Sequence, residues 1–269
     1  MALEWPLPIF DRLNVSQFIY VTREGAVVLI GINRPEKKNA LTAEMYKALA
    51  DALYAAAADE AVRVVLLHGE GGCFTAGNDL ADFATPRPDA NETPAIRFLR
   101  EIAHFKKPLV AAVEGVAVGI GTTMLLHCDL VYATPQTRFA LPFVNLAVVP
   151  EAASSYLLPR IAGWQRAAEM LMLGEPVSAE QALAAGMINA IVSPDRLMEI
   201  AMAAASKLAA KPPLALRETK RLMKQADYER IDSALRAEAR VFAQCLQSQE
   251  AREAFAAFFE KRKPDFSRF

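Results

Sequence analysis

One glutamate and the turns around it carry the clearest chemical signal in the sequence. Glu151 ends an apolar segment, Leu141–Glu151, that holds no other ionisable side chain. Apolar surroundings disfavour the charged carboxylate and raise its pKa, which suits a general acid–base group at neutral pH. The same position also fits a plain structural role, since an acid near a helix start is favoured by the helix dipole.

Two glycine-containing turns could supply the partner of such a base. They are Cys73–Leu80 (CFTAGNDL) and Gly115–Gly121 (GVAVGIG), and each follows a strand-like run. Glycine before a helix start allows a sharp turn that leaves backbone N–H groups pointing outward. Two such groups from different loops can hold a carbonyl oxygen that gains negative charge, as in an oxyanion hole. Taken singly, each glycine is explained equally well by a tight strand–helix turn.

Other site types are disfavoured by the motifs that are missing. The Gly119–Gly121 segment lacks the third glycine of a dinucleotide fingerprint, because Met124 stands there, and no GxxxxGK[ST] motif occurs. The three histidines have no metal-ligand spacing, so no metal site is expected. Ser154 and Ser155 lie outside any GxSxG motif and are interpreted as the cap of a following helix.

Composition predicts one sizeable globular chain. Of its 269 residues 53% are apolar and 23% charged, with a net charge of −1. The near-neutral balance gives no support for a nucleic-acid partner. Three distant cysteines without a CxxC motif favour a reducing compartment. No signal peptide and no apolar run of ~18 residues is visible, so we expect no membrane partner and a cytoplasmic protein.

The elements that must position these residues alternate between strand and helix in the first part of the chain, which predicts an α/β fold. Thr42 is the expected N-cap of a helix that runs to Ala58, and Gly119–His127 is also expected to be helical. The Pro- and Asp-rich segment Ala81–Thr93 is expected to be a mobile surface loop. The predicted strands are Ala26–Ile32, Arg63–His68, Pro108–Val113 and Asp129–Ala133.

Helical patterns dominate the rest of the chain. We therefore divide it into an expected catalytic core, residues 1–195, and a helical region, residues 196–269. Such a helical region is expected to serve oligomerisation, by packing against a neighbouring subunit, or to cover its own core and the active site. The predicted helices are Asp195–Ala210, Pro213–Gln225, Glu229–Gln244 and Gln249–Lys261.

Taken together, the motifs of the chain resemble those of the crotonase, or enoyl-CoA hydratase/isomerase, superfamily over about residues 20–260. Several matches at consistent spacing are more specific than any one glycine turn. The matching segments are Arg34–Leu41 (RPEKKNAL), Phe74–Leu80 (FTAGNDL), Lys107–Gly115 (KPLVAAVEG), Cys128-Asp129 and Ser178–Gly186 (SAEQALAAG).

The resemblance implies a fold of stacked ββα turns with a C-terminal helical region that builds trimers, often paired into hexamers. It implies an acyl-CoA thioester as ligand, with coenzyme A as part of the substrate and no separate cofactor. The oxyanion donors would be the N–H groups of Asn78 and Ile120. The CoA path would be lined by the residues around them, namely Ala76, Gly77, Asn78, Asp79, Leu80, Ala81, Gly119 and Phe143. Lys37 and Lys38 fit either CoA phosphates or a solvated charge pair.

The chain departs from the hydratase pattern at both acidic positions. Thr123 stands where a hydratase carries its first glutamate, and Phe143 follows Pro142 where it carries the second. Pro150–Tyr156 (PEAASSY) instead resembles the Δ3,Δ2-enoyl-CoA isomerase branch, which has a single catalytic glutamate. That likeness makes Glu151 the base that moves a C2 proton to C4, with the side chain of Asn78 a candidate to orient it.

Three alternatives remain open from the sequence. One is an enoyl-CoA hydratase, another a different crotonase reaction such as dehalogenation or ring chemistry, and the third a non-catalytic acyl-CoA-binding homologue. Fatty-acid degradation is the expected pathway, with the catabolism of aromatic or terpenoid acids as the alternative.

Overall fold

The computed structural model of the protein describes residues 13–83 and 93–269. Its centre is a seven-stranded sheet with the order β1-β2-β3-β4-β5-β7-β10. The strands from β3 to β10 are parallel, while β1 and β2 extend one edge in antiparallel fashion. Their bounds are β1 Leu13–Asn14, β2 Ile19–Glu24, β3 Val27–Ile32, β4 Val64–Gly69, β5 Leu109–Val113, β7 Leu130–Ala133 and β10 Ala190–Ile191.

A second, smaller layer of strands follows the first. It contains β6 (Val116–Val118), β8 (Arg138–Ala140) and β9 (Val177–Ser178), in the order β6-β8-β9. The isolated bridge Thr75↔Ala117 connects the turn after β4 to β6 of this layer, and the bridge Leu41↔Asn78 connects the same turn to the loop before α1. The chain thus passes repeatedly from the large sheet to the second layer and then into a helix. The expected stack of ββα turns is confirmed.

The helices begin and end close to the predicted positions. Thr42 caps α1 as expected, since its side chain accepts a hydrogen bond from the backbone N–H of Met45. The predicted helix Gly119–His127 is divided into α4 and a 3₁₀ helix, Met124–His127. The bounds in the first part are α1 Ala43–Ala58, α2 Leu80–Phe83, α3 Pro94–Ala103, α4 Ile120–Thr123, α5 Ser154–Ala162, α6 Trp164–Ala168 and α7 Ala179–Ala184.

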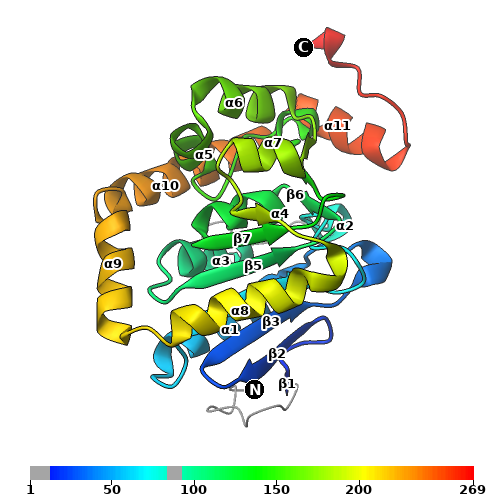
Figure 1. Cartoon of the computed structure of the whole chain (residues 1–269). Helices are drawn as coiled ribbons and strands as arrows, with labels where there is room; N and C mark the ends of the chain where they lie inside the picture. Colours follow the sequence, from blue (N-terminus) through cyan, green and yellow to red (C-terminus); the bar gives the residue numbers. More distant parts are fainter. Residues whose placement is uncertain (1–12, 84–92) are drawn as a thin grey trace.

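The C-terminal helices are confirmed, with bounds α8 Leu197–Ala209, α9 Pro213–Gln225, α10 Tyr228–Leu246 and α11 Gln249–Phe259. Helix α8 crosses the large sheet, whereas α10 lies beside α5 at the other end of the molecule (Figure 1). Of the predicted loop Ala81–Thr93, Ala81 lies in α2 and Thr93 caps α3; residues 84–92 lie outside the described ranges. In the described ranges no helix is both long and apolar enough to cross a bilayer.

Both faces of the sheet are buried, which explains the continuous apolar strands. Successive side chains of a strand point to opposite faces. In β3, Val28 and Ile30 join the main core, whereas Val27 and Leu29 pack with Leu197 of α8 in a second cluster. The region after residue 195 therefore contributes a helix to the core of the sheet.

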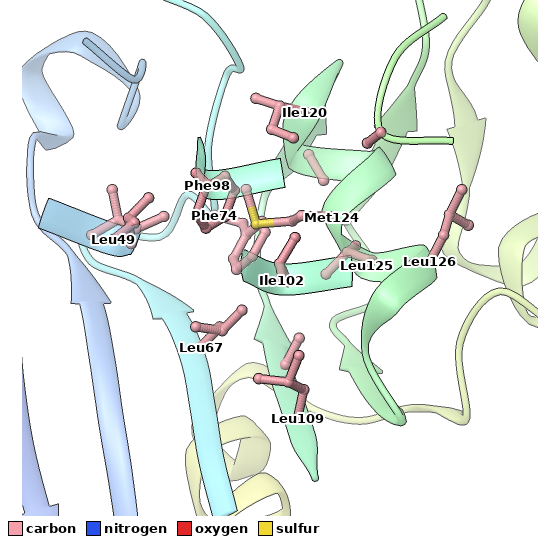
Figure 2. Packing of buried hydrophobic residues seen from close by; sticks show 14 of the residues in the cluster. Leu49, Leu67, Phe74, Phe98, Ile102, Leu109, Ile120, Met124, Leu125 and Leu126 are labelled. Carbon is pink, nitrogen blue, oxygen red and sulfur yellow. The ribbon is translucent and has the colours of Figure 1, made fainter. Parts of the chain in front are cut away.

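The main core extends directly beneath the functional loops. Phe74, Phe98 and Met124 gather between the strands and the surrounding helices (Figure 2). Phe74 follows β4, and Ile120 begins α4, so the two glycine turns are anchored in one packed cluster. Close packing of this kind restricts side-chain and backbone movement.

The predicted cap of α5 is wrong in its detail. Neither Ser154 nor Ser155 is the N-cap; the helix begins at Ser154, after Ala153 in the left-handed region. The N-terminal N–H groups are bound by the carboxylate of Glu238 from α10. Sequence-local capping rules could not show this, because the partner comes from a distant helix.

Candidate active site

The two glycine turns lie against each other at the second strand layer. The N–H of Thr75 donates to the carbonyl oxygen of Val116 at 3.0 Å, and the N–H of Val118 donates to that of Thr75 at 3.0 Å. Gly77 has φ +87°, and a Cβ atom there would lie 2.6 Å from the carbonyl oxygen of Val118. Only glycine permits both this conformation and this approach.

This arrangement places two backbone donors near each other in the fold. For the N–H groups of Asn78 and Ile120, no hydrogen-bond acceptor is present among the described residues. Ile120 is the first residue of α4, where a helical N–H has no intrahelical partner. Its side chain is buried in the core beside Met124, which fixes the direction of the N–H (Figure 2).

A cavity of about 560 Å³ opens beside these turns. Its wall is mainly apolar and contains eight of the predicted site residues, namely Ala76, Gly77, Asn78, Asp79, Leu80, Ala81, Gly119 and Phe143. The rest of the wall comes from the loop before α1, the end of β6, the segment that leads to Glu151, α10, α11 and the residues after α11. These residues are Ala40, Val118, Pro142, Asn145, Leu146, Val148, Phe242, Ala254, Phe255, Phe258, Phe259, Arg262 and Pro264. The C-terminal helices thus close one side of the cavity within the same chain.

The charged side chains of the wall are engaged in ion pairs. Asp79 accepts from Arg34 at 2.7 Å, and Arg262 is paired with Glu253 and Glu260. Lys37 and Lys38 are exposed and do not line the cavity, although the Lys38 carbonyl accepts the N–H of Ala76.

Glu151 and Ile120 lie next to the cavity but are not among the residues that line it. Glu151 is half-buried and follows the lining residue Val148 by three positions. The hydroxyl of Thr123, at the end of α4, donates to Oε1 of Glu151 at 2.5 Å. The carboxylate is therefore fixed to the same short helix that begins with Ile120.

The environment makes Glu151 a base suited to neutral pH. Burial raises the pKa of this carboxyl to about 8; the Thr123 hydrogen bond opposes the rise, and the negative charge of Glu238 adds to it. The apolar segment before Glu151 contributes to these surroundings, but Tyr156 after it has a polar partner. Phe143, Leu146 and Val148 line the adjoining cavity, whereas the hydroxyl of Tyr156 donates to Asp227 of the loop before α10.

The side chain of Asn78 does not orient Glu151, contrary to the sequence-based expectation. Its Oδ1 accepts a hydrogen bond from the Tyr46 hydroxyl at 2.5 Å. The bond to the Glu151 carboxylate comes from Thr123 instead. The hydrogen bond between Thr75 and Val116 fixes the backbone of this turn, and Tyr46 of α1 supplies the partner of the Asn78 side chain.

Sequence reasoning missed three polar residues that surround Glu151. Thr123 was noted only for the glutamate it replaces, His127 only as the end of a predicted helix, and Glu238 was not singled out. His127 lies within hydrogen-bond distance of the Ala152 carbonyl, with Nε2 at 2.8 Å. His127 and Glu238 are both buried. His127 could have been found as a polar residue directly after the apolar run Met124–Leu126, whereas Glu238 lies in a helix rich in charged residues and carries no such signal.

The arrangement combines an apolar cavity, two backbone donors that lack an acceptor among the described residues, and a carboxyl with a pKa of about 8. Such a combination can stabilise an enolate oxygen and move a proton. In the described part of the chain, no group of three or more His, Cys, Asp or Glu residues could hold a metal ion.

Comparison with known proteins shows which family has this architecture. Residues 22–268 match the enoyl-CoA hydratase/isomerase family. The chain is 35% identical to 2,3-dehydroadipyl-CoA hydratase of Escherichia coli K12, over 92% of this chain and 98% of that protein. It is 36% identical to enoyl-CoA delta isomerase 2 of Rattus norvegicus, over 94% of this chain and 66% of that protein.

A solved structure shows the same fold. The enoyl-CoA hydratase/isomerase from Pseudoalteromonas atlantica T6c superimposes with a TM-score of 0.90 at 42% identity, covering 93% of this chain and 100% of that one. The family match spans the glycine turns, Glu151 and the C-terminal helices. The chain is therefore a member of the enoyl-CoA hydratase/isomerase family and has the crotonase fold.

Proposed function

We propose that the protein is a Δ3,Δ2-enoyl-CoA isomerase, in which Glu151 moves a proton from C2 to C4 of a 3-enoyl-CoA. The N–H groups of Asn78 and Ile120 act as the oxyanion hole for the thioester oxygen. The product is trans-2-enoyl-CoA, an intermediate type consistent with fatty-acid degradation.

The proposed reaction needs one acid–base group and no water. The Glu151 carboxylate takes a proton from C2, which is both α to the thioester carbonyl and allylic. The electron pair of that C–H bond moves into the dienolate, and the thioester oxygen gains the negative charge. The carbonyl then re-forms, the double bond shifts from C3=C4 to C2=C3, and C4 takes the proton back from the Glu151 carboxyl.

The observation that carries the proposal is that no glutamate accompanies Glu151 at either of the two hydratase positions. Threonine and phenylalanine occupy the two positions where a hydratase carries glutamates, and Thr123 is hydrogen-bonded to Glu151. Asp79, the acidic residue in the cavity wall, is paired with Arg34. A single carboxyl with a pKa of about 8 supports proton transfer within one substrate better than activation of water by two carboxylates.

Because Glu151 lies beside the cavity, the proposed reaction requires a particular path of the acyl chain. The acyl chain must pass Gly119 and Phe143, which line the cavity, to bring C2 and C4 near the carboxylate. Reaction requires a carboxylate oxygen at roughly 3–3.5 Å from each carbon. A crystal structure with a non-reactive acyl-CoA would measure these distances directly.

The central experiment follows double-bond migration. Purified protein is incubated with 3-hexenoyl-CoA, and formation of 2-hexenoyl-CoA is measured for the wild type and Glu151→Gln. We expect turnover by the wild type and a loss of at least about 100-fold in the variant, because the amide cannot accept the C2 proton. Lack of turnover by the wild type refutes the isomerase, and full activity of the variant removes Glu151 from the mechanism.

Hydration is the second candidate, since one relative is named as a hydratase. Water addition to crotonyl-CoA distinguishes the two functions. A hydration rate comparable to the isomerisation rate would favour the hydratase, whereas the loss of both hydratase glutamates predicts a rate lower by about 10²-fold or more. Tight acyl-CoA binding without either reaction would identify a non-catalytic homologue.

We also propose that the chain assembles as a homotrimer or a dimer of trimers. Exposed apolar side chains on the α6 region and on α9 support the proposal, among them Trp164, Met172, Leu214 and Met223. Light scattering after size exclusion would distinguish one, three and six subunits of 29.4 kDa.

A further inference from the structure

The turn that presents Glu151 has an unusual backbone. Ala152 and Ala153, which follow Glu151 directly, have φ of +58° and +56°. Non-glycine residues in the left-handed region are strained and persist where the surroundings hold them in place. Both alanines are fully buried, so protein contacts must supply the stabilisation.

Glu238 holds this turn from α10. Its carboxylate accepts the N–H of Ala153 at 2.6 Å, the N–H of Ser155 at 2.9 Å and the hydroxyl of Ser155 at 2.5 Å. Glu238 is itself 6% exposed. A buried carboxylate that accepts three hydrogen bonds at the start of α5 is well placed for the helix dipole, and it fixes both the turn and the helix.

His127 holds the other side of the same turn. Its Nε2 lies 2.8 Å from the carbonyl oxygen of Ala152, and burial lowers the pKa of the imidazole to about 3. The nearby ammonium groups of Lys224 and Lys220 lower it further. His127 is therefore neutral across the pH range of activity, and its hydrogen bond does not titrate there.

The charged groups around Glu238 leave its charge uncompensated. On α5, Arg160 is paired with Asp227, and at the end of α3, His104 is paired with Asp232. In the described ranges, no cation forms an ion pair with Glu238. Its other surroundings are an apolar cluster formed by Ala103, Ala153, Ile231, Tyr156, Leu157, Ala234 and Leu235.

We propose that Glu238 is a positioning residue for Glu151, which holds the Ala152–Ala153 turn in its left-handed conformation and places a second negative charge behind the base. The proposal rests on the proposed function of Glu151. Proximity of a like charge disfavours the ionised form of Glu151 and so makes it a stronger base. Burial also raises the pKa of Glu238, while its hydrogen bonds to Ser155 and Ala153 lower it.

Two variants separate the effect of the Glu238 charge from the effect of the length of its side chain. Glu238→Gln removes the charge and turns an NH₂ group toward a backbone N–H, whereas Glu238→Asp keeps the charge on a shorter side chain. Glu229→Gln is the matched control, because it removes an exposed carboxylate from the same helix. For each protein, kcat, KM and the pH dependence of 3-hexenoyl-CoA isomerisation are measured.

We expect Glu238→Gln to lower kcat roughly 10- to 100-fold with little change in KM, because a displaced base reacts poorly while the cavity is intact. The pH at which activity is half-maximal should move downward, since the neighbouring negative charge is gone. Glu238→Asp should keep the wild-type midpoint, and Glu229→Gln should match the wild type in every parameter.

A second readout does not depend on activity. The ¹³C resonance of the Glu151 carboxyl, assigned by its disappearance in Glu151→Gln, is titrated in the wild type and in Glu238→Gln. A lower midpoint in Glu238→Gln supports the proposal, and an unchanged or higher midpoint overturns it. Because this titration needs no turnover, failure of the isomerase proposal would be recognised separately, by an inactive wild type with a normal Glu151 titration.

Discussion

The hydroxyl of Thr123 donates a hydrogen bond to Oε1 of Glu151 at 2.5 Å. Threonine stands here at the position where the hydratase pattern carries a glutamate. Thr123, which stands in place of this hydratase glutamate, therefore contacts Glu151 directly. Thr123 is fully buried and its hydrogen bond favours the ionised carboxylate, opposing the burial that raises the Glu151 pKa.

Replacing Thr123 by valine should therefore make Glu151 harder to ionise. For the wild type we expect kcat/KM to rise with pH and to reach half its maximum near pH 8, because the base must be deprotonated. In Thr123→Val the midpoint should move to higher pH, and the rate at pH 7 should fall about three- to tenfold.

The neighbouring threonine provides the control. Thr122 is also fully buried, but its hydroxyl donates to the carbonyl oxygens of Ala117 and Ala140. Thr122→Val should lower the thermal midpoint without moving the pH profile. A shift of the profile in Thr122→Val, or none in Thr123→Val, would contradict the assigned role of Thr123.

Glu151 should cost the protein stability at alkaline pH. Its pKa is raised from 4.5 to about 8, so the folded state binds the proton more tightly than the unfolded state. This contribution favours folding at low pH and is lost as the pH rises from about 4.5 through about 8. Glu151→Gln removes the titration, and it should match the wild type near pH 4.5 and gain about 1 kcal/mol or more at pH 8.5.

Thermal denaturation at several pH values checks this expectation. A gain of 1 kcal/mol corresponds to roughly 2–4 °C for a domain of this size. The difference between variant and wild type should grow steadily across the interval from pH 5 to pH 8. A constant difference would mean that the effect comes from packing and not from the charge.

Ile120→Pro tests the backbone donor of α4. Proline at the first position of a helix is compatible with helical geometry and removes the N–H group. Ile120→Ala is the matched control, because it also shortens the buried side chain but keeps the N–H. We expect kcat to fall about 10²-fold in Ile120→Pro relative to Ile120→Ala, the effect of losing one oxyanion donor. Equal kcat values would exclude this N–H from the reaction.

Gly77→Ala tests the close approach of the two glycine turns. The new Cβ would lie 2.6 Å from the Val118 carbonyl oxygen, so the turns must separate. At Gly72 the φ angle is also positive, +69°, but no atom lies within 4 Å of an added Cβ. Gly72→Ala should cost only the backbone strain of about 1–2 kcal/mol, with kcat preserved.

In Gly77→Ala we expect a larger loss of thermal stability and a fall in kcat, because the Asn78 N–H moves with the turn. Thermal denaturation and the 3-hexenoyl-CoA assay measure the two effects. Similar stability and kcat for both variants would show that the contact with Val118 does not position the donor.

Local patterns accounted for the longer elements of the fold. The run Ala26–Ile32 predicted β3 and Thr42 predicted the cap of α1, because apolar periodicity and capping depend on neighbours in the chain. The six-residue edge strand β2 and the short strands β1, β6, β8, β9 and β10 were not predicted. Strands of two or three residues show no measurable alternation, and they form only because the next turn of the stack supplies their hydrogen bonds.

For the site, the sequence by itself determined which groups are available: a lone glutamate after Pro150, glycines at the two turns, and no glutamate at positions 123 and 143. Tertiary structure decided how those groups interact. Glu238 binds Ala153 from 85 residues away, and Asn78 turned out to bind Tyr46 and not Glu151. Hydrogen bonds and charge interactions depend on distance in space, which chain spacing does not fix, so the environment that sets the Glu151 pKa emerged only from packing.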